Sequence, residues 1–144
     1  MQERIPSGEH LVSIDGKGRV VIPVPFRQFF SDGLVLTRGL EGGVDVLTLP
    51  YWQKVEERLA NMPTLDINAR NLRKIYYSSA HETKLDKQGR VLIPPVLRRT
   101  AGLRDKAIVL STGDHVEIWD EDRYFERIEE LSKNLVIPES LRDL

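Results

Sequence analysis

The sequence contains no cysteine among its 144 residues. This absence excludes a disulfide framework, a thiolate zinc site and a cysteine nucleophile. A long apolar run is also missing, because the longest, residues 20–26, holds two prolines and is far shorter than the ~20 residues that span a membrane. The first residues, Met1-Gln2-Glu3-Arg4, do not lead into the apolar segment of a signal peptide. We therefore expect a cytoplasmic protein.

Neither sign of charge is in excess, because 21 Lys and Arg residues face 22 Asp and Glu residues. The distribution along the chain is uneven. Residues 67–106 carry ten basic and three acidic side chains, whereas residues 114–144 carry four basic and ten acidic ones. A nearly neutral chain can therefore present one strongly positive face. Two ordinary solvated surfaces would explain the same counts, so charge alone identifies no partner.

The chain contains an internal repeat. Residues 15–23 read DGKGRVVIP and residues 86–94 read DKQGRVLIP. Further along, residues 44–47 correspond to residues 116–119. Two copies of one supersecondary unit, each near half of the chain, indicate a duplicated fold.

Both copies show the same order of elements: an extended run, a glycine turn, a strand that stops at proline, a short helix and two more strands. In the first copy we expect the strands at 11–14, 20–22, 34–37 and 44–47, and the short helix at 25–30. In the second copy we expect strands at 83–85, 91–93, 107–110 and 116–119, and the short helix at 95–99. Apolar spacing also predicts helices containing Trp52, Tyr76 and Tyr124, the last capped by Asp120.

One such unit has exposed strand edges and only half a core. Two copies can interleave, so we expect an α+β, mainly β fold: one pseudo-twofold closed barrel with the helices packed outside. The expected divisions are 8–56 for the first repeat, 57–78 for a helical connector, 79–126 for the second repeat, and 127–144 for the end of the last helix and a tail.

Residues suited to catalysis are scarce. Of the three histidines, His10, His81 and His115, the first two occupy equivalent places just ahead of a strand, where a structural role suffices. No carboxylate lies at a sequence spacing that would complete a zinc or two-metal site. The run Gly16-Lys17-Gly18 enters a strand, so no helix dipole would aim at a phosphate. We expect no enzyme activity, metal, cofactor or small-molecule substrate.

The repeated Asp-x-x-Gly-Arg turn is the main candidate site. Asp15 and Asp86 can cap local backbone N–H groups at the start of each turn. Gly18 and Gly89 can supply the positive φ that such a turn requires. These four residues are therefore expected to shape the turns.

The arginines have no such explanation, because a turn requires no guanidinium group. Arg19 and Arg90 would lie along a β-ribbon together with Lys17, Lys84 and Lys87. The major groove of B-DNA admits a two-stranded ribbon, and arginine can bind guanine through two hydrogen bonds. Alternatively, each arginine pairs with the aspartate of its own turn and locks it. The residues alone leave both explanations open.

The doubled motif resembles the MraZ family of bacterial transcriptional regulators, which contain two tandem SpoVT/AbrB-type repeats. Besides the turns, the resemblance lies in LTRGLEGGVDVL at 36–47, RRTAGL at 98–103 and VEIWDEDRY at 116–124. The first turn has the family's DxKGR form, with Lys17. The second turn departs from it, because Lys87 falls one position earlier.

The resemblance implies a swapped-hairpin AbrB-type barrel formed by both repeats of one chain. It also implies binding to short, spaced direct repeats of double-stranded DNA upstream of the division and cell-wall gene cluster, including the regulator's own gene. A ring-like homo-oligomer at the nucleoid belongs to the same picture. By position, Lys17, Arg19, Lys87 and Arg90 would contact DNA. Four further cations are candidates for phosphate contacts: Arg27, Lys84, Arg98 and Arg99.

A protein-binding module is the main competing function. Antitoxins with related swapped-hairpin folds bind a toxin chiefly through an extended tail and need one repeat per chain. This sequence has two repeats, helices after both and an acidic tail, which favours the regulator. A purely structural ring protein would not require the repeated cationic turn. The exposed sides of the helices around Trp52 and Tyr124 are candidate subunit contacts.

Overall fold

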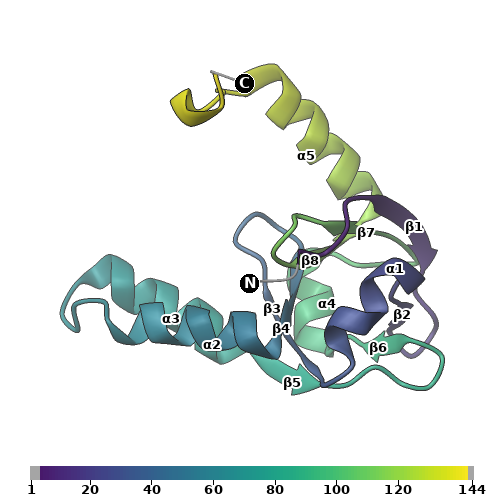
Figure 1. Cartoon of the computed structure of the whole chain (residues 1–144). Coiled ribbons are helices and arrows are strands. Elements are labelled where there is room, and N and C mark those ends of the chain that lie inside the picture. Colours follow the sequence, from purple (N-terminus) through teal and green to yellow (C-terminus); the bar gives the residue numbers. More distant parts are fainter. Residues whose placement is uncertain (1–3, 143–144) are drawn as a thin grey trace.

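The computed structural model describes residues 4–142 (Figure 1). Its strands are β1 (Glu9–Ser13), β2 (Arg19–Val21), β3 (Leu34–Arg38), β4 (Val44–Thr48), β5 (His81–Thr83), β6 (Arg90–Leu92), β7 (Lys106–Ser111) and β8 (Val116–Asp120). Its helices are α1 (Val24–Arg27), α2 (Leu49–Ala60), α3 (Ile67–Ser79), α4 (Pro95–Ala101) and α5 (Glu121–Asn134), with 3-10 turns η1 (Gln28–Phe30) and η2 (Glu139–Leu141). The order of elements in the first half recurs in the second, as the internal repeat predicts.

Strands of the two repeats are interleaved in one large sheet. The large sheet has the order β1-β7-β8-β4-β3-β5, and all neighbouring strands are antiparallel. The first strand of each repeat pairs with the third strand of the other, β1 with β7 and β5 with β3. The remaining strands, β2 and β6, pair with each other as a separate ribbon. The expected α+β fold with interleaved repeats is confirmed, although the helices contain more residues than the strands.

The strands do not form one continuously hydrogen-bonded ring. Within residues 4–142, β1 and β5 are the edges of the large sheet, and an isolated bridge between Ile14 and Val20 links it to the ribbon. The expected closed barrel is therefore not formed by strand hydrogen bonds within these residues. β5 also lies two residues earlier than expected, because residues 81–83 pair with β3 while Leu85 packs against the core.

A single hydrophobic core fills the space between the ribbon and the large sheet. Equivalent residues of the two repeats contribute in pairs, such as Val20 with Val91 and Ile22 with Ile93, all of them fully buried. Phe26, at the start of the first short helical segment, is equally buried. Because each strand alternates between faces, the same register turns the other ribbon side chains outward.

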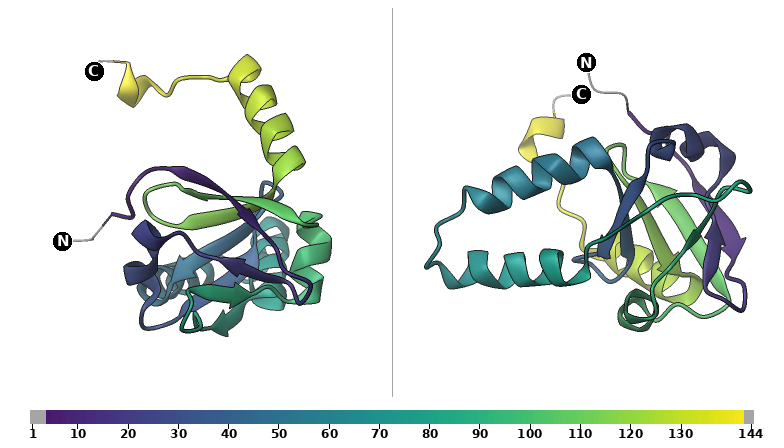
Figure 2. Two further views of the ribbon diagram at one scale, coloured as in Figure 1. Left: turned by 90° about the vertical axis from the view of Figure 1, so that its right-hand side faces the viewer. Right: turned by 90° about the horizontal axis from the view of Figure 1, so that it is seen from below.

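The helices lie outside the strands, as expected (Figure 2). Helices α2 and α3 project together from the side of the sheet, and Trp52 of α2 contacts the rings of Tyr76 and Tyr77 of α3. Helix α5 leaves the body, and the carboxylate of Asp120 caps it by accepting a hydrogen bond from the backbone N–H of Arg123. Within the described part of the chain, no helix combines the length and apolar character needed to cross a bilayer.

Truncation of a ribbon residue should destabilise the protein only where the side chain faces the core. Ile22→Ala leaves a cavity at a fully buried position and should lower the free energy of unfolding by about 2–5 kcal/mol. Val21→Ala, at the neighbouring residue with 37% exposure, should cost less than about 1 kcal/mol. Urea denaturation of both variants checks this, and equal losses would contradict the observed orientation of the ribbon.

Candidate nucleic-acid interface

The first turn is held together by one carboxylate. Oδ1 of Asp15 accepts hydrogen bonds from the backbone N–H groups of Lys17 and Arg19, both at 2.9 Å. The N–H of Gly18 donates to the carbonyl of Asp15 at 2.9 Å, and Gly18 has φ +89°. This left-handed conformation favours glycine, because it has no Cβ.

The second turn repeats this arrangement. Oδ1 of Asp86 accepts from the N–H groups of Gln88 and Arg90, both at 2.9 Å. Gly89 has φ +76°, and its N–H donates to the carbonyl of Asp86 at 3.0 Å. Two sequence segments that differ in their middle residues therefore fold into the same turn.

Each aspartate also orients the arginine at the end of its turn. The Nε atom of Arg19 lies 2.6 Å from Oδ2 of Asp15, and Nε of Arg90 lies 2.7 Å from Oδ2 of Asp86. Within residues 4–142, the terminal amino groups of neither arginine donate a hydrogen bond. The two explanations for these arginines are therefore compatible, since the ion pair locks the turn and leaves both terminal amino groups of each guanidinium, with four N–H donors, available to a partner.

The same hydrogen bonds keep the aspartates ionised. The backbone N–H of Arg19 is the largest cause that lowers the pKa of Asp15, which falls to about 2. The backbone N–H of Arg90 likewise lowers the pKa of Asp86. Both carboxylates are therefore charged at neutral pH and hold their arginines in place.

The outer face of the ribbon combines positive charge with apolar side chains. In the register of β2 and β6, Arg19 lies opposite Leu92 and Val21 lies opposite Arg90. The two arginines thus occupy diagonal positions, separated by Val21 and Leu92, which are 37% and 53% exposed. These two apolar residues were not among the predicted site residues. Their alternation with buried Val20 was the available signal.

Two arginines that were candidates for phosphate contacts lie beneath the turns instead of projecting from them. Nε of Arg27 donates to the carbonyl of Ile22 at 2.7 Å, and Nε of Arg98 donates to that of Ile93 at 3.0 Å. Both side chains are half-buried. A Cβ added to Gly89 would lie 2.3 Å from Nε of Arg27, and one added to Gly18 would lie 2.6 Å from Nε of Arg98. Each arginine therefore packs against the turn glycine of the other repeat.

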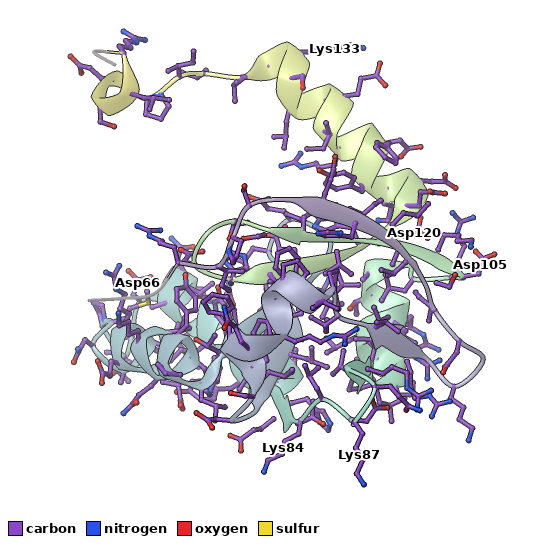
Figure 3. All side chains as sticks on the ribbon, turned by 45° about the vertical axis from the view of Figure 1, so that its right-hand side comes forward. Asp66, Lys84, Lys87, Asp105, Asp120 and Lys133 are labelled. Carbon is purple, nitrogen blue, oxygen red and sulfur yellow. The ribbon has the colours of Figure 1, made fainter. Side chains whose placement is uncertain are left out.

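The remaining candidate cations are exposed. Lys17, Lys84, Lys87 and Arg99 all project into solvent. Lys84 and Lys87 point away from the body on the side of the ribbon (Figure 3). The basic residues of α3, by contrast, belong to the α2–α3 pair on the other side of the large sheet (Figure 1). The fold thus brings part of the basic stretch to the ribbon and separates the rest from it.

Comparison with known proteins identifies the family. The family model described as "MraZ protein, putative antitoxin-like" matches residues 5–75 and again residues 76–142. The chain belongs to the MraZ family. The predicted resemblance is confirmed, and each matched segment contains one Asp-x-x-Gly-Arg turn and supplies one strand of the ribbon.

Several curated MraZ proteins are similar over most of their length. The transcriptional regulator MraZ of Thermus thermophilus is 48% identical over 142 residues, which cover 97% of this chain and 99% of that protein. The one of Deinococcus radiodurans is 44% identical over 120 residues, 83% of this chain and 84% of that protein. The one of Lactobacillus delbrueckii subsp. bulgaricus is 36% identical over 138 residues, 95% and 96% of the two chains.

Low pH should destabilise the first turn over a defined pH range. The pKa of Asp15 is lower in the folded chain than in the unfolded one, so its contribution to stability is complete above about pH 4 and is lost as the pH falls through about 2. Asp15→Asn should therefore lower the melting temperature at pH 5–7, and the difference from the wild type should shrink below pH 4.

Thermal unfolding of the two proteins over this pH range measures the effect. Asp32→Asn, a change at an exposed aspartate outside both turns, is the matched control and should leave the melting temperature unaltered. A deficit in Asp15→Asn that is the same at every pH would show that the carboxylate charge does not stabilise the turn.

Proposed function

We propose that this chain is a transcriptional regulator that binds double-stranded DNA through the outer face of the β2–β6 ribbon and the two turns beside it. The pair of arginines that the turn aspartates orient is the observation that carries the proposal. A two-stranded ribbon fits the major groove of B-DNA. The names of the relatives support the same role, since all three are called transcriptional regulators.

The contacts of this ribbon would divide into two kinds. Arg19 and Arg90 would read guanine through their terminal amino groups, and Val21 and Leu92 would contact thymine methyl groups. The exposed lysines beside the ribbon would contact phosphates, which adds affinity without sequence information. Those lysines are Lys17, Lys84 and Lys87, and Arg99 of α4 is a further candidate. Arg27 and Arg98 would act through the turns that they support.

A small interface of this kind calls for several subunits. Each ribbon strand has three residues, so one chain would reach few base edges, and such short sites recur throughout any genome. A ring-like homo-oligomer on spaced direct repeats would make later contacts effectively intramolecular. The proposed targets are the repeats upstream of the division and cell-wall gene cluster, including the regulator's own gene, which would place the protein at the nucleoid.

Helix α5 supplies a candidate subunit surface. It projects from the body (Figure 1), and its apolar side chains Phe125, Ile128 and Leu131 are 51%, 40% and 37% exposed. The Trp52 stripe is a weaker candidate, because its indole packs between α2 and α3. Residues 135–137 continue the exposed apolar surface beyond α5. The same surface favours the alternative function, an antitoxin-like protein-binding module, which would use this tail and not the ribbon.

Loss of a ribbon arginine should weaken binding to the operator while the fold persists. Arg19→Ala or Arg90→Ala removes a two-bond contact to a base and should cost about 1–3 kcal/mol, roughly a 5- to 150-fold loss of affinity. Arg19→Lys should restore little, because lysine keeps the charge but lacks the planar pair of donors. Gel shifts on DNA from the chain's own upstream region measure the effect.

Arg70→Ala is the matched control for these variants, since it removes an exposed arginine from α3, away from the ribbon. The affinity of Arg70→Ala for the DNA should stay within about twofold of that of the wild type. Unchanged DNA affinity in Arg19→Ala with a reduced melting temperature would assign the arginine to the turn alone. Failure of the wild type to shift its upstream DNA would favour the protein-binding alternative.

Affinity should depend on the number of repeats in the DNA. Operators with two or three correctly spaced repeats should bind the wild type on the order of 10²-fold or more tightly than one repeat. Ile128→Asp places a charge on the apolar stripe of α5. It should reduce the particle size in light scattering and also the gain in affinity for DNA with several repeats. Glu129→Ala, beside it on the same exposed helix, should change neither. A monomeric wild type that binds one repeat as tightly as three would contradict the proposed avidity.

A further inference from the structure

A cluster of ionisable side chains lies on the face of the large sheet opposite the ribbon. Asp45 of β4 and Glu117 of β8 are direct cross-strand partners, and His115 immediately precedes β8. Asp45 and Glu117 correspond to each other in the internal repeat, so the cluster lies where the two repeats meet. The alternate residues Val46 and Val116 are buried in the core, which places the cluster on the other face.

Three potential ligand atoms converge in this cluster. Nε2 of His115 is hydrogen-bonded to Oε2 of Glu117 at 2.8 Å and lies 3.8 Å from Oδ1 of Asp45. One ligand atom from each residue lies within 4.8 Å of the other two. Around a tetrahedral zinc ion with bonds of ~2.0–2.2 Å, neighbouring ligand atoms are roughly 3.3 Å apart. The observed distances bracket that spacing.

Further residues fix the orientation of the three side chains. Nδ1 of His115 lies 2.7 Å from a carboxylate oxygen of Asp114, which leaves Nε2 facing the other two acids. The indole Nε1 of Trp119 donates to Oε1 of Glu117 at 2.9 Å, and the ring of Tyr51 stacks on His115. A carboxylate on the far nitrogen of a histidine is the usual outer support of a metal ligand.

The loop between β3 and β4 leaves space over the cluster. The three residues line a cavity of about 180 Å³, whose rim includes Gly39 and Gly43. A Cβ on Gly39 would lie 3.0 Å from Oδ1 of Asp45, and one on Gly43 would lie 2.6 Å from Nε1 of Trp119. Neither glycine has a positive φ, so close contacts account for the missing side chains. At Gly39 the nearest atom is the carbonyl oxygen of Gly43, 2.7 Å from the added Cβ, and the carboxylate of Asp45 comes second. The cavity has room for an ion and a water molecule.

His115 is the shared ion-pair partner of Asp45, Asp114 and Glu117, so one imidazole faces three carboxylates. Like charges directly opposite each other on a sheet destabilise it, and Asp45 faces Glu117. Asp114 and Glu41 add two further carboxylates nearby. Within residues 4–142, no lysine or arginine forms an ion pair with Asp45 or Glu117, and no hydrogen bond reaches the carboxylate of Asp45. A divalent cation would add positive charge to that of the single imidazole and give Asp45 a direct ligand bond in place of its 3.8 Å ion pair with His115.

We propose that Asp45, His115 and Glu117 bind one divalent transition-metal ion of the zinc type, with water in the fourth position. One imidazole and two carboxylates suit zinc and similar ions, whereas magnesium and calcium prefer oxygen ligands alone. The site joins β4 of the first repeat to β8 of the second, so the ion clamps the two repeats together. Sequence spacing gave no sign of this site, because only the fold brings Asp45 to His115.

Metal binding by the full chain tests the proposal. After treatment with a chelator, calorimetric titration with ZnCl₂ should give one ion per chain, and Co²⁺ should give the visible absorption of a four-coordinate site. Zinc at a hundredfold excess over Kd should raise the melting temperature by on the order of 10 °C, because it binds the folded chain. Magnesium at the same concentration should have no such effect.

His115→Gln and Asp45→Asn should each weaken zinc binding at least ~10-fold. His81→Gln, at an exposed histidine of β5, is the matched control and should bind as the wild type does. If His115→Gln fails to fold, Asp45→Asn carries the test, since the amide fits the same space without the charge. The proposal is overturned if the wild type binds no zinc, or if zinc binds all variants equally. Neither result affects DNA binding, which is measured separately on the ribbon.

Discussion

Two backbone hydrogen bonds that cross between the repeats fix the position of the ribbon. The N–H of Ile22 donates to the carbonyl of Gly89 at 2.8 Å, and the N–H of Ile93 donates to the carbonyl of Gly18 at 3.0 Å. Each turn glycine therefore has two roles. Its positive φ allows its own turn to form, and its carbonyl accepts a hydrogen bond from the other repeat. The absence of a side chain at these positions also lets the guanidinium groups of Arg27 and Arg98 approach. One constraint, close contact at two glycines, thus holds both turns.

The functional face depends on this constraint through the strand register. A shift of one residue in β2 would exchange the two faces of the strand, and would bury Arg19 while it exposed Val20. Burial of a charged group without a partner costs several kcal/mol, so the crossed bonds and the core select the same register. The turn aspartates then refine the orientation within that register, because each binds Nε of its arginine. Backbone geometry and ion pairing therefore act on the same two side chains.

The sequence alone predicts local structure better than it predicts long-range contacts. Strand alternation and proline placed most elements within about two residues, because those signals are short-range. The exposed edges of each unit predicted that the repeats interleave, but the swapped pairing came from the resemblance to a known family, because no local pattern specifies which partner a strand chooses. The same limit applies to Arg27 and Arg98, whose charge suggested phosphate contacts although the fold packs them against turn glycines. The cluster at His115 was missed for the same reason, since Asp45 is distant in sequence.

The two repeats are alike at the ribbon and unlike on the opposite face. Around the turns, the main difference is the place of the lysine, Lys17 in one and Lys87 in the other. On the other face, Gly43 occupies the place that His115 has in the second repeat, and the α2–α3 pair differs from the single helix α5. An antiparallel ribbon with true twofold symmetry would bind a DNA site equally well in both directions. The direct repeats proposed as targets have a direction, so under that proposal the small differences between the turns, or the arrangement of whole subunits, would supply it.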